Sequence, residues 1–418
     1  MSSPSPSPPI SRLTNEVLQE IFSNMNPEPR AWRELEPHSE LTELALVSKR
    51  WADVAKRELL THVYLCELSD DAQRLKSFRD MLRASPTSAA IVRGIHFGSW
   101  MEDIDEIENE TLGEILTLCP NLVEVRLQGC MPNTAPLVQA LAACPKLQKV
   151  YISDRPIEHV GCECDPFCTA PEFLTMLQSS WPAIQSVTLA DGAVGPREDE
   201  EDVASTWTTL ANSCPFLTRL EISCPAAVQD QYLLALSEIA PSISSLELDN
   251  GQGNKNRLTE AALTTILNRW GASMTSLTII HWQAPYPGEE YYSARLDPVL
   301  SAMPVLRDLS ITSSYLSPTS LACDFGALAV LEYEIRAEEG AAVTSALRET
   351  GSMPALRKVK ISLRERPAKL SSDLNDLLDG LRDSCKSRGI DFDDEGLRKQ
   401  TPLLFRCAVV DVSVLEDR

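Results

Sequence analysis

A nine-residue phrase recurs along most of this 418-residue chain. Clear copies are CPNLVEVRL at 119–127, CPKLQKVYI at 144–152, CPFLTRLEI at 214–222 and MPALRKVKI at 353–361. They share an L-x-x-L-x-L core, whose first apolar residue lies at 92, 122, 147, 184, 217, 243, 274, 306, 328 and 356. Successive copies are between 22 residues (306 to 328) and 37 residues (147 to 184) apart. Self-similarity at periods of this size indicates a chain built from stacked supersecondary units.

Each copy predicts one short strand, and several stretches between the copies predict helices. TAPLVQALAAC at 134–144 and TEAALTTILNRW at 259–270 carry apolar residues at helical spacing. One strand and one helix cannot bury their apolar faces alone, so several units must stack around a shared core. We therefore predict an α/β fold, in which an irregular repeat solenoid covers residues 66–396. The segment SCKSRGIDF at 384–392 fits one more, shorter unit.

A cysteine precedes the proline of the phrase in several copies, at Cys119, Cys144 and Cys214. The proline lacks an N–H group and fixes φ, so it ends the preceding helix. Because the cysteine recurs in one structural slot, we predict that it is a small buried packing residue and not a metal ligand.

The residues that alternate with the strand leucines form a polar row on one face of the predicted sheet. Its middle positions are His96, Arg126, Tyr151, Thr188, Glu221, Glu247, Thr278, Ser310, Glu332 and Lys360. The row has mixed charge, which suits a protein or peptide better than a nucleic acid. Two interpretations stay open with equal weight: a partner-binding face, and an ordinary solvated strand face. For the first, the candidate binding residues are Arg126, Tyr151, Glu221, Glu247, Glu332 and Lys360.

Two amphipathic helical patterns precede the repeats. The first is LTNEVLQEIF at 13–22, with Thr14 or Asn15 available to cap the helix. The second helix is predicted to begin near Ser39 and to include LALVSKRWADVAKRELL at 44–60. Its lysines and arginines alternate with acidic residues, so it carries no sustained basic stripe. The apolar stripe is therefore the informative side, either as ordinary core or as a docking surface.

Together the two segments resemble the F-box. That family pairs a start like L-P-x-E-[VIL]-L-x-x-I-F with a later L-x-x-V-[CS]-[KR]-x-W, and this chain departs from it at Thr14, where proline is usual, and at Leu59-Leu60, where many relatives have Leu-Trp. The resemblance covers about residues 10–65. It implies docking on a Skp-family adaptor, and through it a cullin, in an SCF-type (cullin-RING) ubiquitin ligase. The apolar positions that match those used for docking or for holding the helices together are Leu13, Val17, Leu18, Ile21, Phe22, Leu46, Val47 and Trp51.

The remainder, about residues 60–395, resembles the leucine-rich-repeat class of F-box proteins, and the long insert between the two helical patterns resembles fungal members. The resemblance implies a non-catalytic substrate-recognition subunit, with the repeats binding a protein substrate. The alternative is a leucine-rich-repeat interaction scaffold whose degenerate F-box no longer recruits a ligase. No glycine-rich phosphate loop, H-E-x-x-H or G-x-S-x-G motif occurs, so we expect neither catalysis nor a cofactor.

Net charge limits the classes of partner, and cysteine content bears on the cellular compartment. The formal net charge is -22, which argues against binding to nucleic acid or to an anionic membrane. No signal peptide and no run of about 20 apolar residues is seen. The 12 cysteines are therefore expected to be mostly reduced, in the cytoplasm or nucleus.

One segment raises the question of a metal. HVGCECDPFC at 159–168 places four soft ligands within ten residues, namely His159, Cys162, Cys164 and Cys168. Zinc accepts such groups, but structural sites usually combine two separated knuckles and this segment has one compact C-x-C. An unligated cysteine-rich loop is the favoured interpretation. The predicted organisation is thus a disordered Ser/Pro tail at 1–9, F-box-like helices at 10–65, the solenoid at 66–396, and a cap or tail at 397–418.

Overall fold

The computed structural model describes residues 13–25, 38–66, 71–98, 106–129, 134–153, 166–190, 193–195, 209–223, 229–249, 258–280, 295–322, 325–335, 339–348, 353–363 and 372–393. The predicted tails at 1–9 and 397–418 lie outside these ranges. The chain divides into two compact units, Met1–Trp270 and Gly271–Arg418, which are described in turn. No helix in the described ranges combines the length and apolar character needed to cross a bilayer.

Three helices open the first unit: α1 (Asn15–Met25), α2 (His38–Ala45) and α3 (Lys49–Thr61). The prediction of a single helix from near Ser39 through residue 60 is therefore wrong. A turn interrupts it, because the Ser48 backbone is extended (φ -163, ψ 162) and its side chain accepts a hydrogen bond from the Trp51 N–H. Ser48 thus acts as an N-cap that starts a new helix.

The three helices enclose a small apolar core of their own. Its fully or almost fully buried members are Leu18, Phe22, Leu41, Val54 and Ala55. The rings of Phe22 and Trp51 meet edge to face, with centroids 5.5 Å apart and an interplanar angle of 67°. Such aromatic contacts stabilise beyond the area they bury. The core thus joins residues from all three helices.

Polar groups also fasten α1 to α3. Arg50 Nε donates to Asn15 Oδ1 at 2.6 Å, and a terminal guanidinium nitrogen of Arg50 donates to the Leu13 carbonyl. At the start of α1 the Val17 N–H donates to Thr14 Oγ1 at 3.4 Å, which confirms Thr14 as a capping residue. A threonine therefore supports the helix start at the position where the F-box pattern usually has proline.

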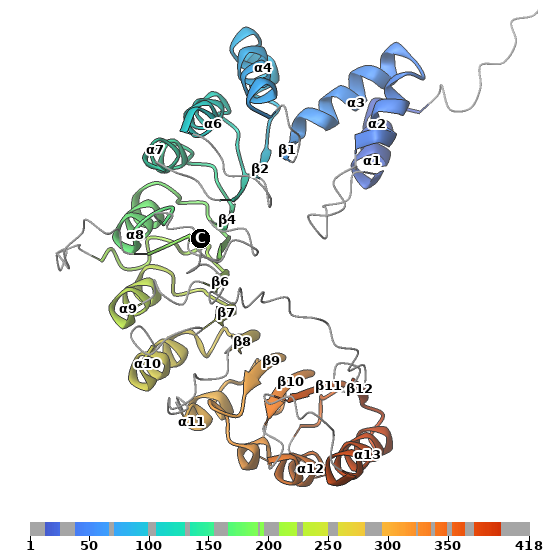
Figure 1. Ribbon diagram of the computed structural model, residues 1–418, viewed down its shortest axis with the longest axis vertical. Coiled ribbons are helices and arrows are strands. Elements are labelled where there is room, and N and C mark those ends of the chain that lie inside the picture. Colours follow the sequence, from blue (N-terminus) through green and yellow to red (C-terminus); the bar gives the residue numbers. More distant parts are fainter. Residues whose placement is uncertain are drawn as a thin grey trace, which may run out of the picture. The chain divides into compact units, whose positions relative to one another are not determined.

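Seven parallel strands follow in chain order in the first unit. They are β1 (His62–Cys66), β2 (Gly94–Gly98), β3 (Glu124–Gln128), β4 (Lys149–Ser153), β5 (Ser186–Ala190), β6 (Arg219–Ser223) and β7 (Ser245–Asp249). The accompanying helices are α4 (Asp71–Ala84), α5 (Pro86–Ala89), α6 (Glu106–Leu118), α7 (Ala135–Ala142), α8 (Ala170–Ser179), α9 (Asp230–Ile239) and α10 (Glu260–Trp270). Helices α6 to α10 lie along one side of the strands (Figure 1). The order is consistent with a solenoid-like repeat.

The core of this unit lies between the strands and those helices. In β3 the inward residues Val125 and Leu127 are fully buried, and so is Leu122 just before the strand. This alternation is what the phrase predicts. The junction with the N-terminal helices has no loop, because α3 ends at Thr61 and β1 begins at His62.

The cysteine slot is buried, as predicted. Cys119, Cys144 and Cys214 are free thiols, and each is at most 5% exposed. Burial raises the pKa of Cys119 to about 12, with a further contribution from neighbouring Cys144. Cys214 Sγ lies 2.9 Å from the carbonyl of Leu177, which belongs to α8 in the preceding strand-helix repeat. In the copy at 181–189 the same slot holds Trp181, whose Nε1 donates to the Leu141 carbonyl at 2.9 Å.

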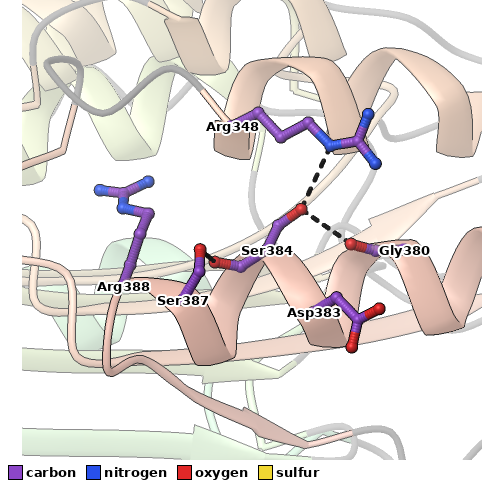
Figure 2. Close-up of a pocket in the computed structure, with 6 residues that line it drawn as sticks. All are labelled: Arg348, Gly380, Asp383, Ser384, Ser387 and Arg388. Atoms are coloured by element: carbon purple, nitrogen blue, oxygen red, sulfur yellow. Dashed lines mark hydrogen bonds between the residues drawn. The ribbon is translucent and has the colours of Figure 1, made fainter.

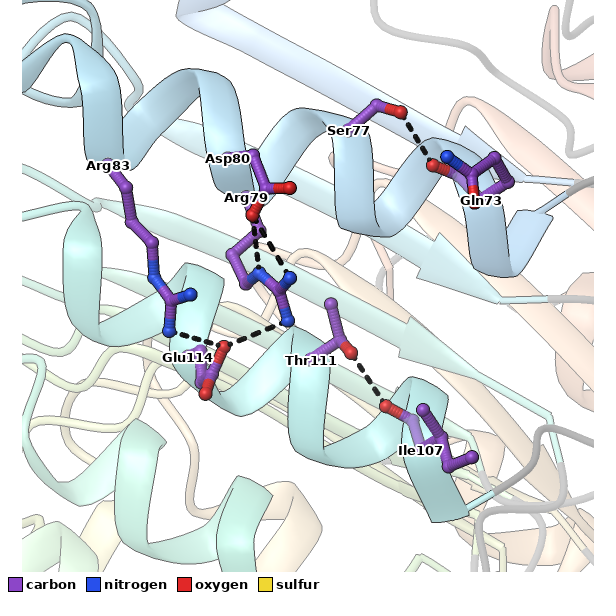
Figure 3. A network of polar contacts seen from close by, with 8 residues as sticks. All are labelled: Gln73, Ser77, Arg79, Asp80, Arg83, Ile107, Thr111 and Glu114. Atoms are coloured by element: carbon purple, nitrogen blue, oxygen red, sulfur yellow. Dashed lines mark hydrogen bonds and ion pairs between the residues drawn. The ribbon is translucent and has the colours of Figure 1, made fainter.

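Ion pairs join neighbouring helices on the surface of the first unit. Arg79 and Arg83 of α4 both reach Glu114 of α6, at 3.3 Å and 2.9 Å. Asp80 pairs with Arg79 at 3.0 Å, which completes the network in Figure 3. These groups are partly or largely exposed, so the network links α4 to α6 but adds little to stability.

The second unit repeats the same plan with five parallel strands in chain order. They are β8 (Ser276–Ile280), β9 (Asp308–Thr312), β10 (Val330–Ile335), β11 (Lys358–Leu363) and β12 (Asp391–Asp393). Its helices are α11 (Asp297–Ser301), the 3-10 helix η2 (Pro318–Ala322), α12 (Gly340–Arg348) and α13 (Ser372–Ser387). Tyr333 is fully buried and its hydroxyl donates to the Leu316 carbonyl at 2.6 Å.

All ten predicted phrases coincide with strands, each beginning two residues after the first apolar residue. The helices predicted at 134–144 and 259–270 are confirmed as α7 and α10, and the short unit at 384–392 ends in β12. Strand β1 was not predicted, although its start at His62 lies 32 residues before that of β2 at Gly94 and so fits the same spacing.

Candidate functional site

Four apolar side chains of the N-terminal helices face solvent, and we call them the exposed apolar set. Val17 and Ile21 of α1 are 43% and 40% exposed, and Leu46 and Val47 are 84% and 59% exposed. Leu46 and Val47 form the turn between α2 and α3, where their N–H groups donate to the carbonyls of Glu43 and Leu44. Because the helix is broken before Ser48, Leu46 and Val47 lie in a turn, and their side chains are exposed to solvent.

The exposed apolar set is concentrated in a short part of the chain. In the described ranges the other large exposed apolar residues are Ile107, Leu210, Phe216 and Val305. Four of the eight therefore fall between residues 17 and 47, whereas the other four are spread over residues 107 to 305.

The remaining predicted adaptor-binding residues hold the helices together. Leu18 and Phe22 are fully buried, while Leu13 and Trp51 are partly buried and pack against the same core. The structure thus divides the eight residues into two groups of four. Leu13, Leu18, Phe22 and Trp51 belong to the helical core or pack against it. The exposed apolar set faces solvent and is available for contact with another protein.

The polar row on the strands has the register that the sequence predicts. In the first unit His96, Arg126, Tyr151, Thr188, Glu221 and Glu247 are successive partners. In the second unit Thr278, Ser310, Glu332 and Lys360 are successive partners. The candidate binding residues Arg126, Tyr151, Glu221, Glu247 and Glu332 are partly exposed, and Lys360 is exposed.

The charges along the row are only partly balanced. Lys360 Nζ lies 3.3 Å from Glu332 Oε1, whereas Glu221 directly faces Glu247 across β6 and β7. Burial, and then the charge of Glu221, raises the pKa of the Glu247 carboxyl despite the nearby Arg219. Arg219 lies 3.6 Å from Glu221 and its side chain is 60% exposed. This part of the row is therefore acidic.

The first three strands bring together a cluster that sequence reasoning missed. One ligand atom each from His62, His96 and Glu124 lie within 4.8 Å of one another. His96 Nε2 is 3.4 Å from Glu124 Oε1, and both residues are buried. These residues are far apart in the sequence, and only the recognition of β1 as a strand would have revealed their proximity.

Basic side chains surround the carboxylate of this cluster. Arg126 Nε donates to Glu124 Oε1 at 2.8 Å, and Lys149 Nζ lies 3.7 Å from Glu124 Oε2. Burial alone would raise the pKa of Glu124, but His96, Arg126 and Lys149 together lower it to about 2. Burial lowers the pKa of His96 in spite of the neighbouring Glu124 carboxylate, which acts in the opposite direction. The carboxylate is thus charged at neutral pH.

A polar hollow of about 340 Å³ occurs in the second unit. Figure 2 shows its lining residues on α12 and α13. Arg348 Nε donates to Ser384 Oγ at 3.2 Å. Arg388 donates to the carbonyls of Leu347 and Met353 at 2.8 Å and 2.9 Å. The bond to Leu347 satisfies a carbonyl in the last turn of α12, and the bond from Arg348 to Ser384 joins α12 to α13, so the arginines serve the fold.

Most of the cysteine-rich segment lies outside the described ranges. His159, Cys162 and Cys164 fall in the gap between 153 and 166, outside the described residues, so the predicted unligated loop and the zinc alternative both stay predictions there. Cys168 is described, and it is fully buried with its Sγ 3.8 Å from the Ala193 carbonyl.

Comparison with known proteins bears on the N-terminal helices. The family model for the F-box domain matches residues 10–62, a range that contains α1, α2, α3 and the exposed apolar set. No curated protein matches the chain significantly. F-box domains typically bind Skp-family adaptors, and F-box proteins are generally non-catalytic adaptors. The helices that open the first unit are therefore the F-box domain that this chain carries over residues 10–62.

Proposed function

We propose that this protein is the substrate-recognition subunit of an SCF-type (cullin-RING) ubiquitin ligase. In this proposal the F-box domain binds a Skp-family adaptor through the exposed apolar set, and the strands behind it are leucine-rich repeats that bind a protein substrate. The observation that carries the proposal is the combination of a matched F-box domain with four solvent-facing apolar side chains on it.

The exposed apolar set has the chemistry of an adaptor interface. Burial of apolar surface contributes about 25 cal/mol per Å² removed from water, so each large side chain covered by a partner is favourable by roughly 1 kcal/mol or more. Helical apolar anchors seated in a partner's groove are a common mode of association. Leu46 is the strongest candidate for such an anchor, since it is 84% exposed and would gain most from being covered.

Co-purification with a recombinant Skp-family adaptor tests the first half of the proposal. The wild type should retain the adaptor, and Leu46→Asp with Val47→Asp should abolish retention while leaving the helical core intact. Phe216→Asp is a matched control, because Phe216 is 60% exposed but lies beyond the F-box domain. Failure of the wild type to retain the adaptor contradicts the ligase function and favours the second candidate, an interaction scaffold with a degenerate F-box.

Substrate binding by the polar row is the second half of the proposal. Glu221 and Glu247 form an acidic position that suits a basic segment of a protein partner. A substrate-trapping pull-down from cells with inhibited cullin activity compares the wild type with the Glu221→Lys, Glu247→Lys double variant. Proteins that the wild type captures should be lost in the double variant, whereas adaptor binding should be unchanged. Equal capture by both would indicate that this part of the row is an ordinary solvated face.

In this function the chain performs no bond chemistry of its own. Other subunits transfer ubiquitin, and the receptor raises the rate by holding the substrate near them. The polar row, the apolar set and the connection between them are the parts that the proposal requires. Such a complex is expected in the cytoplasm or nucleus.

A further inference from the structure

We propose that His62, His96 and Glu124 form a binding site for a divalent transition metal ion of the Zn²⁺ class, located where the F-box domain joins the strands. The three residues come from β1, β2 and β3, and one ligand atom from each lies within 4.8 Å of the others. The inference does not depend on adaptor or substrate binding.

One of the three separations between ligand atoms already matches tetrahedral coordination, and the other two are at most 4.8 Å. Zinc bonds to histidine nitrogen and carboxylate oxygen measure about 2.0–2.2 Å, which places neighbouring ligand atoms in a tetrahedron about 3.3–3.5 Å apart. His96 Nε2 and Glu124 Oε1 are 3.4 Å apart. Two imidazoles and one carboxylate form a three-residue donor set that zinc accepts, with water in the fourth position.

The backbone around the cluster makes room for the imidazole of His62. His62 and Glu124 occupy the same row on β1 and β3, and Gly94 lies between them on β2. A Cβ atom on Gly94 would lie 2.4 Å from His62 Nδ1. The missing side chain therefore allows the His62 ring to lie over β2 toward His96.

The ring of His96 is held by its neighbours. Tyr64 meets it edge to face, with centroids 4.5 Å apart, and the side chain is only 3% exposed. Residues that fix the orientation of a ligand ring strengthen metal binding. His62 is partly exposed and gives an ion a path from solvent.

Two basic side chains compete with a metal ion for Glu124. Arg126 donates to the same oxygen, Oε1, that faces His96, and Lys149 lies beside Oε2. Both have exposed surface, with side chains 25% and 49% accessible, so each can move toward solvent when an ion enters. Their positive charge should weaken the binding of a metal cation. Removing either positive charge should therefore strengthen metal binding.

Isothermal titration of the metal-stripped full chain with ZnCl₂, in a thiol-free reductant, tests the site. The Cys162→Ser, Cys164→Ser variant is the parent for every measurement, because those thiols are separate candidate ligands. The parent should bind one zinc ion, and His62→Ala and His96→Gln should each weaken binding about tenfold or more. Co²⁺ bound to the parent should absorb in the visible without a sulfur-to-metal charge-transfer band.

Two further variants separate ligation from damage to the fold. Gly94→Ala keeps all three ligands but displaces His62, so it should weaken zinc binding while the far-ultraviolet circular dichroism stays that of the parent. Arg126→Gln should tighten binding by about tenfold, since it removes a nearby positive charge. The inference is overturned if the parent binds no stoichiometric zinc, or if His62→Ala and Gly94→Ala bind it as tightly as the parent does.

Discussion

Phe22→Ala and Ile21→Ala are neighbouring changes in α1 with opposite expected consequences. Phe22 is fully buried and its ring contacts that of Trp51, so truncation should destabilise the F-box helices by about 3–5 kcal/mol. Ile21 is 40% exposed, so its replacement removes little buried surface, and alanine has the better helix propensity. The free energy of unfolding should therefore fall by less than about 1 kcal/mol.

Hydrogen exchange measured by mass spectrometry reports these local stabilities within the intact chain. A loss of about 3 kcal/mol raises the exchange rate of core amides in α1 and α3 by about a hundredfold or more. Ile21→Ala should leave those rates within a few fold of the wild type and yet weaken retention of a Skp-family adaptor. Unchanged exchange in Phe22→Ala, or a large increase in Ile21→Ala, would refute the division of these side chains into core and contact residues.

Three other changes have definite outcomes. Arg50→Met removes the hydrogen bond to Asn15 and should lower the stability of α1 by about 1 kcal/mol, seen as faster exchange at the start of that helix alone. Glu247→Gln should raise Tm, because the folded-state pKa of Glu247 is raised by burial and by Glu221, so its ionised form is destabilising. A raised carboxyl pKa means that the folded chain binds the proton more tightly than the unfolded chain does, so the destabilisation by ionised Glu247 grows as pH rises through that pKa. The gain in Tm should therefore be larger at pH 8 than at pH 5. An equal gain at both pH values would contradict ionisation of Glu247 as its cause. Burial raises the pKa of Cys214 to about 11, so iodoacetamide at pH 7.5 should leave it unmodified in the folded chain and label it in denaturant, as peptide mass mapping can show.

The strand ladder was predictable because its pattern is set by burial. An inward leucine must recur wherever a unit contacts the shared core, so the phrase fixes the start of ten strands, and the alternation fixes which residues share a row. The pairing of Glu221 with Glu247 follows from the phrases alone. The polar row could be placed in this way without any knowledge of the loops.

The helix break and the histidine cluster could not be found by the same reasoning. The apolar residues around 44–55 keep a helical spacing across the turn, so periodicity alone suggests one helix, and the stop depends on a local signal, the N-cap at Ser48. Strand β1 directly follows a helix without turn residues, and the residues just before it lack the proline that precedes most of the ten phrases. Unless β1 is recognised as a strand, His62 cannot be assigned to a register position beside Gly94 and Glu124, and its proximity to Glu124 cannot be inferred.

The loop-free passage from Thr61 to His62 has a mechanical consequence. The last turn of α3 and the first residue of β1 share one peptide bond, and β1 is paired along all five of its residues with β2. Reorientation of α3 relative to the paired strand is therefore limited to the backbone torsions of Thr61 and His62, which is less freedom than a linker of several residues would give. In the proposed receptor, this short connection would restrict the distance between the F-box helices and the first strands of the sheet. Two glycines inserted after Thr61 would widen the range of that distance without changing any residue of the exposed apolar set or of the polar row.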